Sequence, residues 1–151
     1  MKTLAPAAEL PVTSALRSFP TIVLADDDPD DRLLFEEAFN SLCLPATLVQ
    51  LDDGDQVMNY LDRSPLPDLL FLDINMPRKS GLQCLAAIKA DPRLASVPVL
   101  ILSTSSNEST IERTIKGGAK SYCIKPCTFQ QLIDIIRNAI EKILPAPLST
   151  A

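Results

Sequence analysis

Four consecutive apolar residues, Leu69 to Leu72, run directly into Asp73 and a turn that contains Pro77. An uninterrupted apolar run of this length, bounded by a turn, predicts a strand buried on both faces, as in parallel sheets. Asp73 then lies at the carboxyl end of that strand, which is the edge of an open α/β sheet where ligands bind. Asp73 could alternatively only cap the loop, but other polar stretches are placed to converge on it.

The rest of the chain alternates between short apolar runs and stretches with helical periodicity. The predicted strands are Thr21–Ala25, Thr47–Leu51, Leu69–Leu72, Pro98–Leu102 and Tyr122–Ile124, and the predicted helices begin near Asp28, Asp53, Ser80, Asn107 and Thr128. Five strand–helix repeats predict an α/β fold, a doubly wound parallel sheet with helices on both faces. Right-handed crossovers bring the carboxyl ends of all five strands to one edge.

Prolines and length set the predicted domain limits. Residues 1–19 contain prolines and few periodic apolar positions, so we expect a flexible arm. Residues 20–144 are predicted to form one domain with a single core, followed by a short tail at 145–151. We expect no output domain.

Composition argues against several classes of function. A net charge of −5 without a basic stripe argues against direct nucleic-acid binding, and the absence of histidine removes His-based catalysis and the usual zinc sites. No apolar run is long enough to span a bilayer, so we expect no membrane association and a cytoplasmic protein. The four cysteines lack a metal-binding spacing and are predicted to be reduced thiols.

Polar side chains follow four of the predicted strands, namely Asp26 and Asp27, Asp73, Ser103 and Lys125. Because these strand ends meet at one edge of the sheet, we expect the side chains to form a site. Carboxylates brought close together repel one another unless a cation lies between them or a proton is taken up. Carboxylate, carbonyl and water oxygens suit Mg²⁺, so the sequence predicts a magnesium site.

The acidic stretch after the first strand has two interpretations. It could be a solvated helix start that the helix dipole favours, and we prefer this for Asp28, Asp30 and Asp31. Asp26 and Asp27 lie nearest the strand end, and for them we prefer metal binding.

With magnesium bound, Asp73 can act as a nucleophile toward a phosphoryl group and form an aspartyl phosphate. The Lys125 ammonium and the Ser103 hydroxyl could each contact one of the other phosphoryl oxygens. The alternatives are a surface lysine and a helix-cap serine. Lys125 precedes Pro126 at a strand end rather than lying on a solvated helix, which favours the functional interpretation.

Together these residues resemble the receiver domains of two-component response regulators over residues 20–143. The resemblance is carried by Asp26-Asp27, by the sequence LDINMP that contains Asp73, by the spacing of Ser103, and by Tyr122 and Lys125-Pro126. Within the family, the acidic first loop and the hydroxyl-rich run after the fourth strand are similar to stand-alone regulators associated with phytochrome-type kinases.

The resemblance implies a flavodoxin-like strand order, 2-1-3-4-5, and phosphorylation of Asp73 by a histidine kinase. It also implies that Asp27, Asp73 and the backbone carbonyl of Asn75 hold Mg²⁺, with Asp26 reaching the ion through water.

The resemblance further implies two residues that respond to phosphorylation. Ser103 would turn inward to the phosphoryl group, and Tyr122 would change rotamer with it. Tyr122 could instead be an ordinary half-buried aromatic. Ser103 stands where the family more commonly has threonine, and this change retains the hydroxyl.

We therefore expect a single-domain response regulator of a phosphorelay, which takes a phosphoryl group from a histidine kinase or phosphotransfer protein and signals through protein contacts. We expect no enzymatic activity beyond its own phosphorylation and dephosphorylation. The alternative is a magnesium-dependent phosphatase of the haloacid-dehalogenase type, which needs an aspartate where Asn75 stands. A flavodoxin is also conceivable, but the aspartates after the first strand would repel its phosphate.

The last predicted helix has more apolar residues than one buried stripe needs: Leu132, Ile133, Ile135, Ile136, Ala139, Ile140 and Ile143. We expect some of them to remain exposed and to form a homodimer interface that phosphorylation tunes. The same face could instead bind a kinase or target, or pack under the arm or tail.

Overall fold

A computed structural model describes residues 19–144, in which five strands alternate with five helices. The predicted arm, apart from Phe19, and the predicted tail therefore fall outside the described residues. The elements are β1 (Thr21–Ala25), α2 (Pro29–Ser41), β2 (Thr47–Leu51), α3 (Gly54–Arg63), β3 (Leu69–Leu72), α4 (Gly81–Ala90), β4 (Val99–Ser103), α5 (Glu108–Lys116), β5 (Ser121–Ile124) and α6 (Phe129–Ile143). Within these residues, no helix is both long and apolar enough to cross a membrane.

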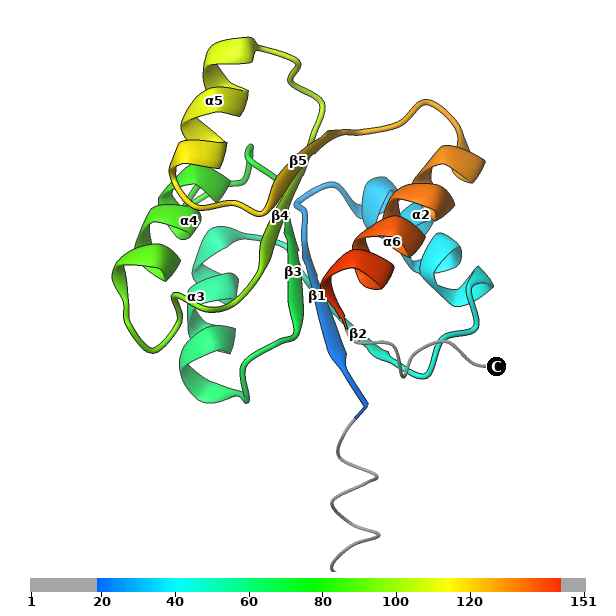
Figure 1. The fold of residues 1–151 in the computed structure, drawn as a ribbon, viewed down its shortest axis with the longest axis horizontal. Helices are drawn as coiled ribbons and strands as arrows, with labels where there is room; N and C mark the ends of the chain where they lie inside the picture. The colour runs from blue at the N-terminus through cyan, green and yellow to red at the C-terminus, as the bar shows by residue number, and fades with distance from the viewer. Residues whose placement is uncertain (1–18, 145–151) are drawn as a thin grey trace, which may run out of the picture.

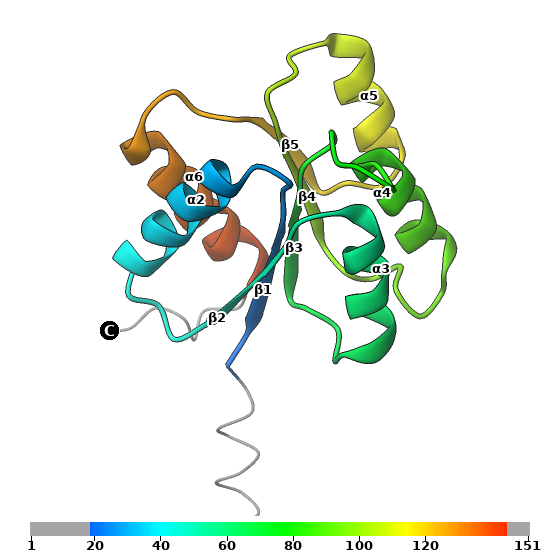
Figure 2. The same cartoon turned by 180° about the vertical axis from the view of Figure 1, so that it is seen from behind.

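The five strands form one parallel sheet in the order β2-β1-β3-β4-β5, as predicted. Helices α2 and α6 cover one face of the sheet, and α3, α4 and α5 cover the other (Figures 1 and 2). The central strand β3 is buried along its whole length, because helices pack on both of its faces. Its carboxyl end therefore lies in the middle of one sheet edge.

The sheet separates two apolar cores. On the side of α2 and α6, Phe71 of β3 packs edge-on against Phe35 of α2, with ring centroids 5.0 Å apart. On the other side, Leu70 and Leu72 pack with residues of α3 and α4, including Leu61 and Leu85. The single predicted core is thus divided into two layers that share the sheet.

Capping side chains start the helices where the sequence predicts. Asp28 is the N-cap of α2, with Pro29 at the first helical position. Thr128 and Gln131 form a capping box at the start of α6. Helix α2 ends at Ser41, and Cys43 shortly after it takes a left-handed conformation with φ 52°. All four cysteines are free, and Cys84 is buried.

The apolar surface of α6 is partly covered. Ile133, Ile135 and Ile143 are half-buried, whereas the other apolar positions of the predicted set are buried. Ile133 and Ile143 pack against the α2–α6 core, and Ile135 lines a hollow between β5 and α6. Some apolar area of this helix therefore remains accessible.

Candidate functional site

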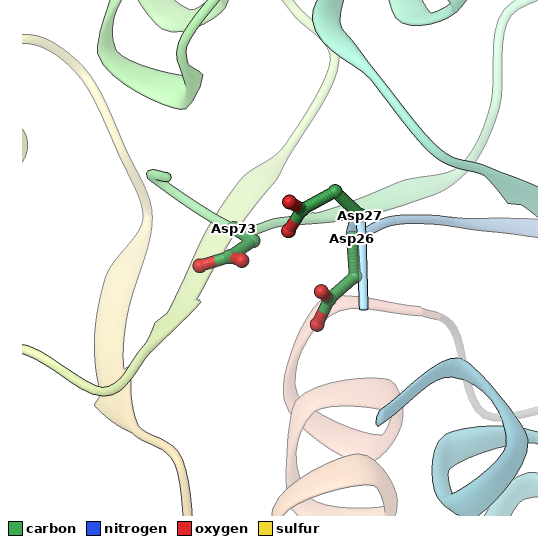
Figure 3. Close-up of side chains that lie close together, drawn as sticks. All are labelled: Asp26, Asp27 and Asp73. Atoms are coloured by element: carbon green, nitrogen blue, oxygen red, sulfur yellow. The ribbon is translucent and has the colours of Figure 1, made fainter. Parts of the chain in front are cut away.

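Three carboxylates lie together at the carboxyl ends of β1 and β3 (Figure 3). Asp26 and Asp27 follow β1, Asp73 follows β3, and one oxygen from each lies within 4.8 Å of the other two. Asp26 and Asp73 are buried, with 2% and 6% of their surface exposed, whereas Asp27 is exposed. The structure thus brings together the three predicted acidic residues, two of them buried and one exposed to solvent.

Backbone hydrogen bonds beyond the strand ends fix these positions. The Asp26 N–H donates to Leu51 O at 3.0 Å, and the Asp73 N–H donates to Ala25 O at 2.9 Å. The ladder of the sheet therefore continues through both aspartates. The Ile74 N–H also donates to the Asp73 carboxylate at 2.8 Å, which orients that side chain.

Lys125, which follows β5, joins the acidic cluster. Its Nζ lies 2.8 Å from Asp26 Oδ2 and 3.5 Å from Asp73 Oδ2, and the side chain is 14% exposed. Burial lowers the pKa of Lys125, but hydrogen bonds to Asp26 and Asp31 outweigh it and raise the pKa above its ordinary value. Lys125 is therefore a fixed positive charge at the site.

One carboxylate lies elsewhere than the sequence suggested. Asp31 was expected to belong to a solvated helix start, but its Oδ2 lies 2.7 Å from Lys125 Nζ. The expectation is wrong because the side chain of Asp31, in the first turn of α2, reaches the strand edge and pairs with Lys125. Asp28 and Asp30 behave as expected, since Asp28 caps the helix and Asp30 is exposed.

The Asp73 carboxylate is in an unfavourable environment for its charge. Burial raises its pKa, Lys125 lowers it and Asp26 raises it, and together these effects bring the pKa to about 6. A nearby cation would stabilise the charged form. Such a group at a sheet edge is typical of a functional site.

Ser103 and Tyr122 meet at the loop after β4 rather than at Asp73. The Ser103 hydroxyl is buried and accepts a hydrogen bond from the Ser105 N–H at 3.2 Å. The half-buried Tyr122 donates its hydroxyl to Ser105 O at 2.7 Å. The predicted movements of these two residues on phosphorylation stay predictions, but both side chains now bond to one residue.

A second ion pair near the site was not predicted. Asp53 is 8% exposed, caps α3 and accepts a hydrogen bond from Arg78 Nε at 3.1 Å. Arg78 has a φ of 69°, which is uncommon for a residue with a side chain. The Asp-Gly turn at residues 53–54 is visible in the sequence, but a contact across 25 residues has no local signal. This pair anchors the loop that follows Asp73 to the start of α3.

The donor set at the site fits a divalent cation. Asp26, Asp27 and Asp73 offer only oxygen atoms, which hard cations such as Mg²⁺ and Ca²⁺ prefer. Asn75 is exposed and lies two residues after Asp73, in the segment that follows β3. Its predicted role as a ligand stays a prediction.

Comparison with known proteins finds response regulators in each case. A family model described as the response regulator receiver domain matches residues 22–137. The response regulator Rcp1 of Synechocystis is 31% identical over 123 residues, covering 78% of this chain and 84% of Rcp1. The chemotaxis protein CheY of Pseudomonas aeruginosa is 30% identical over 122 residues, covering 81% of this chain and 97% of CheY.

Solved structures share the fold. The phosphorylated cyanobacterial phytochrome response regulator RcpA has a TM-score of 0.79 at 34% identity, covering 88% of this chain and all of that one (100%). The Mn²⁺-bound form of Rcp1 has a TM-score of 0.76 at 28% identity, covering 87% of this chain and 99% of that one.

Proposed function

The chain belongs to the response regulator receiver domain family, and from this we propose that Asp73 is its phosphoacceptor. The donor is a histidine kinase or a phosphotransfer protein, and the phosphorylated protein signals through contacts with other proteins. One observation carries the proposal: Asp73 lies at the end of β3, between two further carboxylates and the Lys125 ammonium. Phosphorylation on aspartate is typical of the family.

The side chains of the site support direct transfer of a phosphoryl group from a phosphohistidine to Asp73. An Asp73 carboxylate oxygen forms the new P–O bond while the P–N bond to a phosphohistidine breaks, and the electron pair leaves with the imidazole nitrogen. Lys125 donates to one phosphoryl oxygen, and Ser103 to another after turning inward. We propose that the cation held by Asp26, Asp27, Asp73 and the Asn75 carbonyl is Mg²⁺, which would neutralise charge on the phosphoryl oxygens.

We propose no catalysis on other substrates. A phosphatase of the alternative type would need an acid or base two residues after Asp73, and the Asn75 amide has no group that ionises near neutral pH. We further propose a cytoplasmic location and no direct contact with nucleic acid, which the net charge of −5 supports.

The proposed function is tested by incubating the protein with acetyl phosphate and Mg²⁺. Intact-mass spectrometry should find one added phosphoryl group, and the adduct should be absent without the cation. A protein that gains no phosphoryl group from acetyl phosphate or from any histidine kinase would contradict the proposal.

Metal binding should depend on Asp27 and not on Asp30. Asp27 contributes an oxygen to the cluster, whereas Asp30 is exposed on the first turn of α2. We expect Asp27→Asn to weaken Mg²⁺ binding at least about tenfold, measured by titration calorimetry because the chain contains no tryptophan for fluorescence. Asp30→Asn removes the same charge and should change affinity little. Equal losses in both variants would show that only overall charge matters.

We also propose that the face of α6 forms a homodimer interface that phosphorylation strengthens. Sedimentation with beryllofluoride and Mg²⁺ should show a dimer that Ile135→Asp disrupts, because Ile135 lines the accessible hollow beside β5. Leu33→Asp is the matched control, since Leu33 is 53% exposed on α2. A monomer at every concentration in both states would rule out the homodimer and leave a heterotypic interface.

A further inference from the structure

Lys125 is shared by more carboxylates than phosphoryl transfer needs. Its Nζ is closest to Asp31, at 2.7 Å, then to Asp26, at 2.8 Å, and farthest from the phosphoacceptor Asp73, at 3.5 Å. An ammonium has three N–H donors, and two of them are engaged by the two shorter contacts. In the unmodified protein, Lys125 is therefore held mainly by residues on the β1–α2 side of the site.

Asp31 differs from the other two partners of Lys125. It lies in the first turn of α2, outside the group of three carboxylates that can hold the cation. Its side chain is 36% exposed, whereas those of Asp26 and Asp73 are 3% and 8% exposed. The cation can occupy Asp26 and Asp73, so Asp31 is the partner that keeps competing for Lys125 when the cation is bound.

We propose that Asp31 is a positioning residue that holds Lys125 away from the phosphoryl group, so that the Asp31–Lys125 contact must loosen when Asp73 is phosphorylated. This inference rests on the proposed function of Asp73. A phosphoryl oxygen on Asp73 needs the Lys125 ammonium, and the Asp31 carboxylate draws the same ammonium toward α2. Asp31 thus weakens the phosphorylated state relative to the unmodified state.

The capped first turn of α2 fixes the position of Asp31. Asp28 caps the helix and accepts hydrogen bonds from the Asp30 and Asp31 N–H groups at 2.9 and 3.4 Å. Pro29 fixes the first helical residue, so the turn presents the Asp31 side chain to the strand edge and leaves Asp30 exposed. Two adjacent aspartates on one turn therefore have different surroundings, which provides a matched control.

The experiment compares Asp31→Asn with Asp30→Asn in the full chain. Both variants remove one negative charge from the first turn of α2, and thermal unfolding checks that both stay folded. Beryllofluoride with Mg²⁺ serves as the phosphoryl mimic, and its affinity is measured by calorimetry. We expect Asp31→Asn to bind it roughly two- to fivefold more tightly, as expected for losing a partly exposed competing ion pair, and Asp30→Asn to match the parent.

A second measurement follows Lys125 itself. The side-chain nitrogen signal of Lys125 in NMR spectra of the unmodified protein should shift in Asp31→Asn and not in Asp30→Asn. Equal beryllofluoride affinity in all three proteins would overturn the proposal. Tighter binding with an unchanged Lys125 signal would also overturn it, because the effect would then be simple repulsion of the anion. Failure of the parent itself to bind beryllofluoride would instead count against the proposed function.

Discussion

Asp73→Asn should gain no phosphoryl group from acetyl phosphate and Mg²⁺ under conditions that fully modify the parent protein. The amide is a poor nucleophile, and within residues 19–144 no other carboxylate follows the central strand with Lys125 beside it. Intact-mass spectrometry measures the adduct, and peptide mapping of the parent should locate it on Asp73. The expected effect is complete loss of phosphorylation at this site.

The absence of phosphorylation in Asp73→Asn shows loss of the nucleophile only if the variant is folded. The pKa of Asp73 is raised to about 6 in the fold, against an ordinary value of 3.8. Protonation of Asp73 therefore stabilises the folded protein, and this stabilisation is fully present below pH 3.8 and is lost as the pH rises through about 6. Without divalent cation at neutral pH, Asp73→Asn should be at least as stable as the parent. An equal mass increase in the folded variant would show that the phosphoacceptor is a different residue.

Gly81→Ala should lower the free energy of unfolding and weaken Mg²⁺ binding together. A Cβ at Gly81 would collide with the carbonyl oxygen of Asp73 and lie 2.8 Å from Ile74 Cα. Both are backbone atoms, and Asp73 is held by its hydrogen bond to Ala25, so the strain has no easy release. We expect a loss on the order of 3 kcal/mol, as for severe overpacking. Chemical denaturation and calorimetry measure the two effects.

Gly117→Ala is the matched control for that substitution. Gly117 has an ordinary φ of −74°, and a Cβ there would have no contact shorter than 3.1 Å. The loss of stability should be much smaller, with cation affinity unchanged. A Gly81→Ala protein as stable as Gly117→Ala would mean that the loop after β3 can move away, and that the close approach does not position Asp73.

The fold is largely predictable from local patterns. Strands β1, β3 and β4 each contain a run of four apolar residues, and helix starts such as Asp28-Pro29 and Thr128 carry their own capping signals. Alternation of the two element types leaves few topologies for a parallel sheet. The end of α2 at Ser41 is less predictable, because the left-handed turn at Cys43 has no glycine to mark it.

The candidate site is predictable only where residues follow strands directly. Asp26, Asp73 and Lys125 meet because parallel strands share one edge, so their position along the chain fixes their position in space. Asp31 and the Asp53–Arg78 pair depend on how a helix turn or a loop is oriented. Such contacts join residues far apart in sequence, and periodicity does not encode them.

The division of the molecule into two helical layers around one sheet has a thermodynamic consequence. Lys125 bonds to α2 on one side, while Tyr122 and Ser105 lie in the segments that flank α5. Suppose that a partner docks on either layer and prefers the phosphorylated arrangement. If phosphorylation raises the affinity for this partner by some factor, the bound partner must shift the phosphorylation equilibrium of Asp73 by the same factor. Partners on opposite layers would accordingly sense each other through Asp73 without touching.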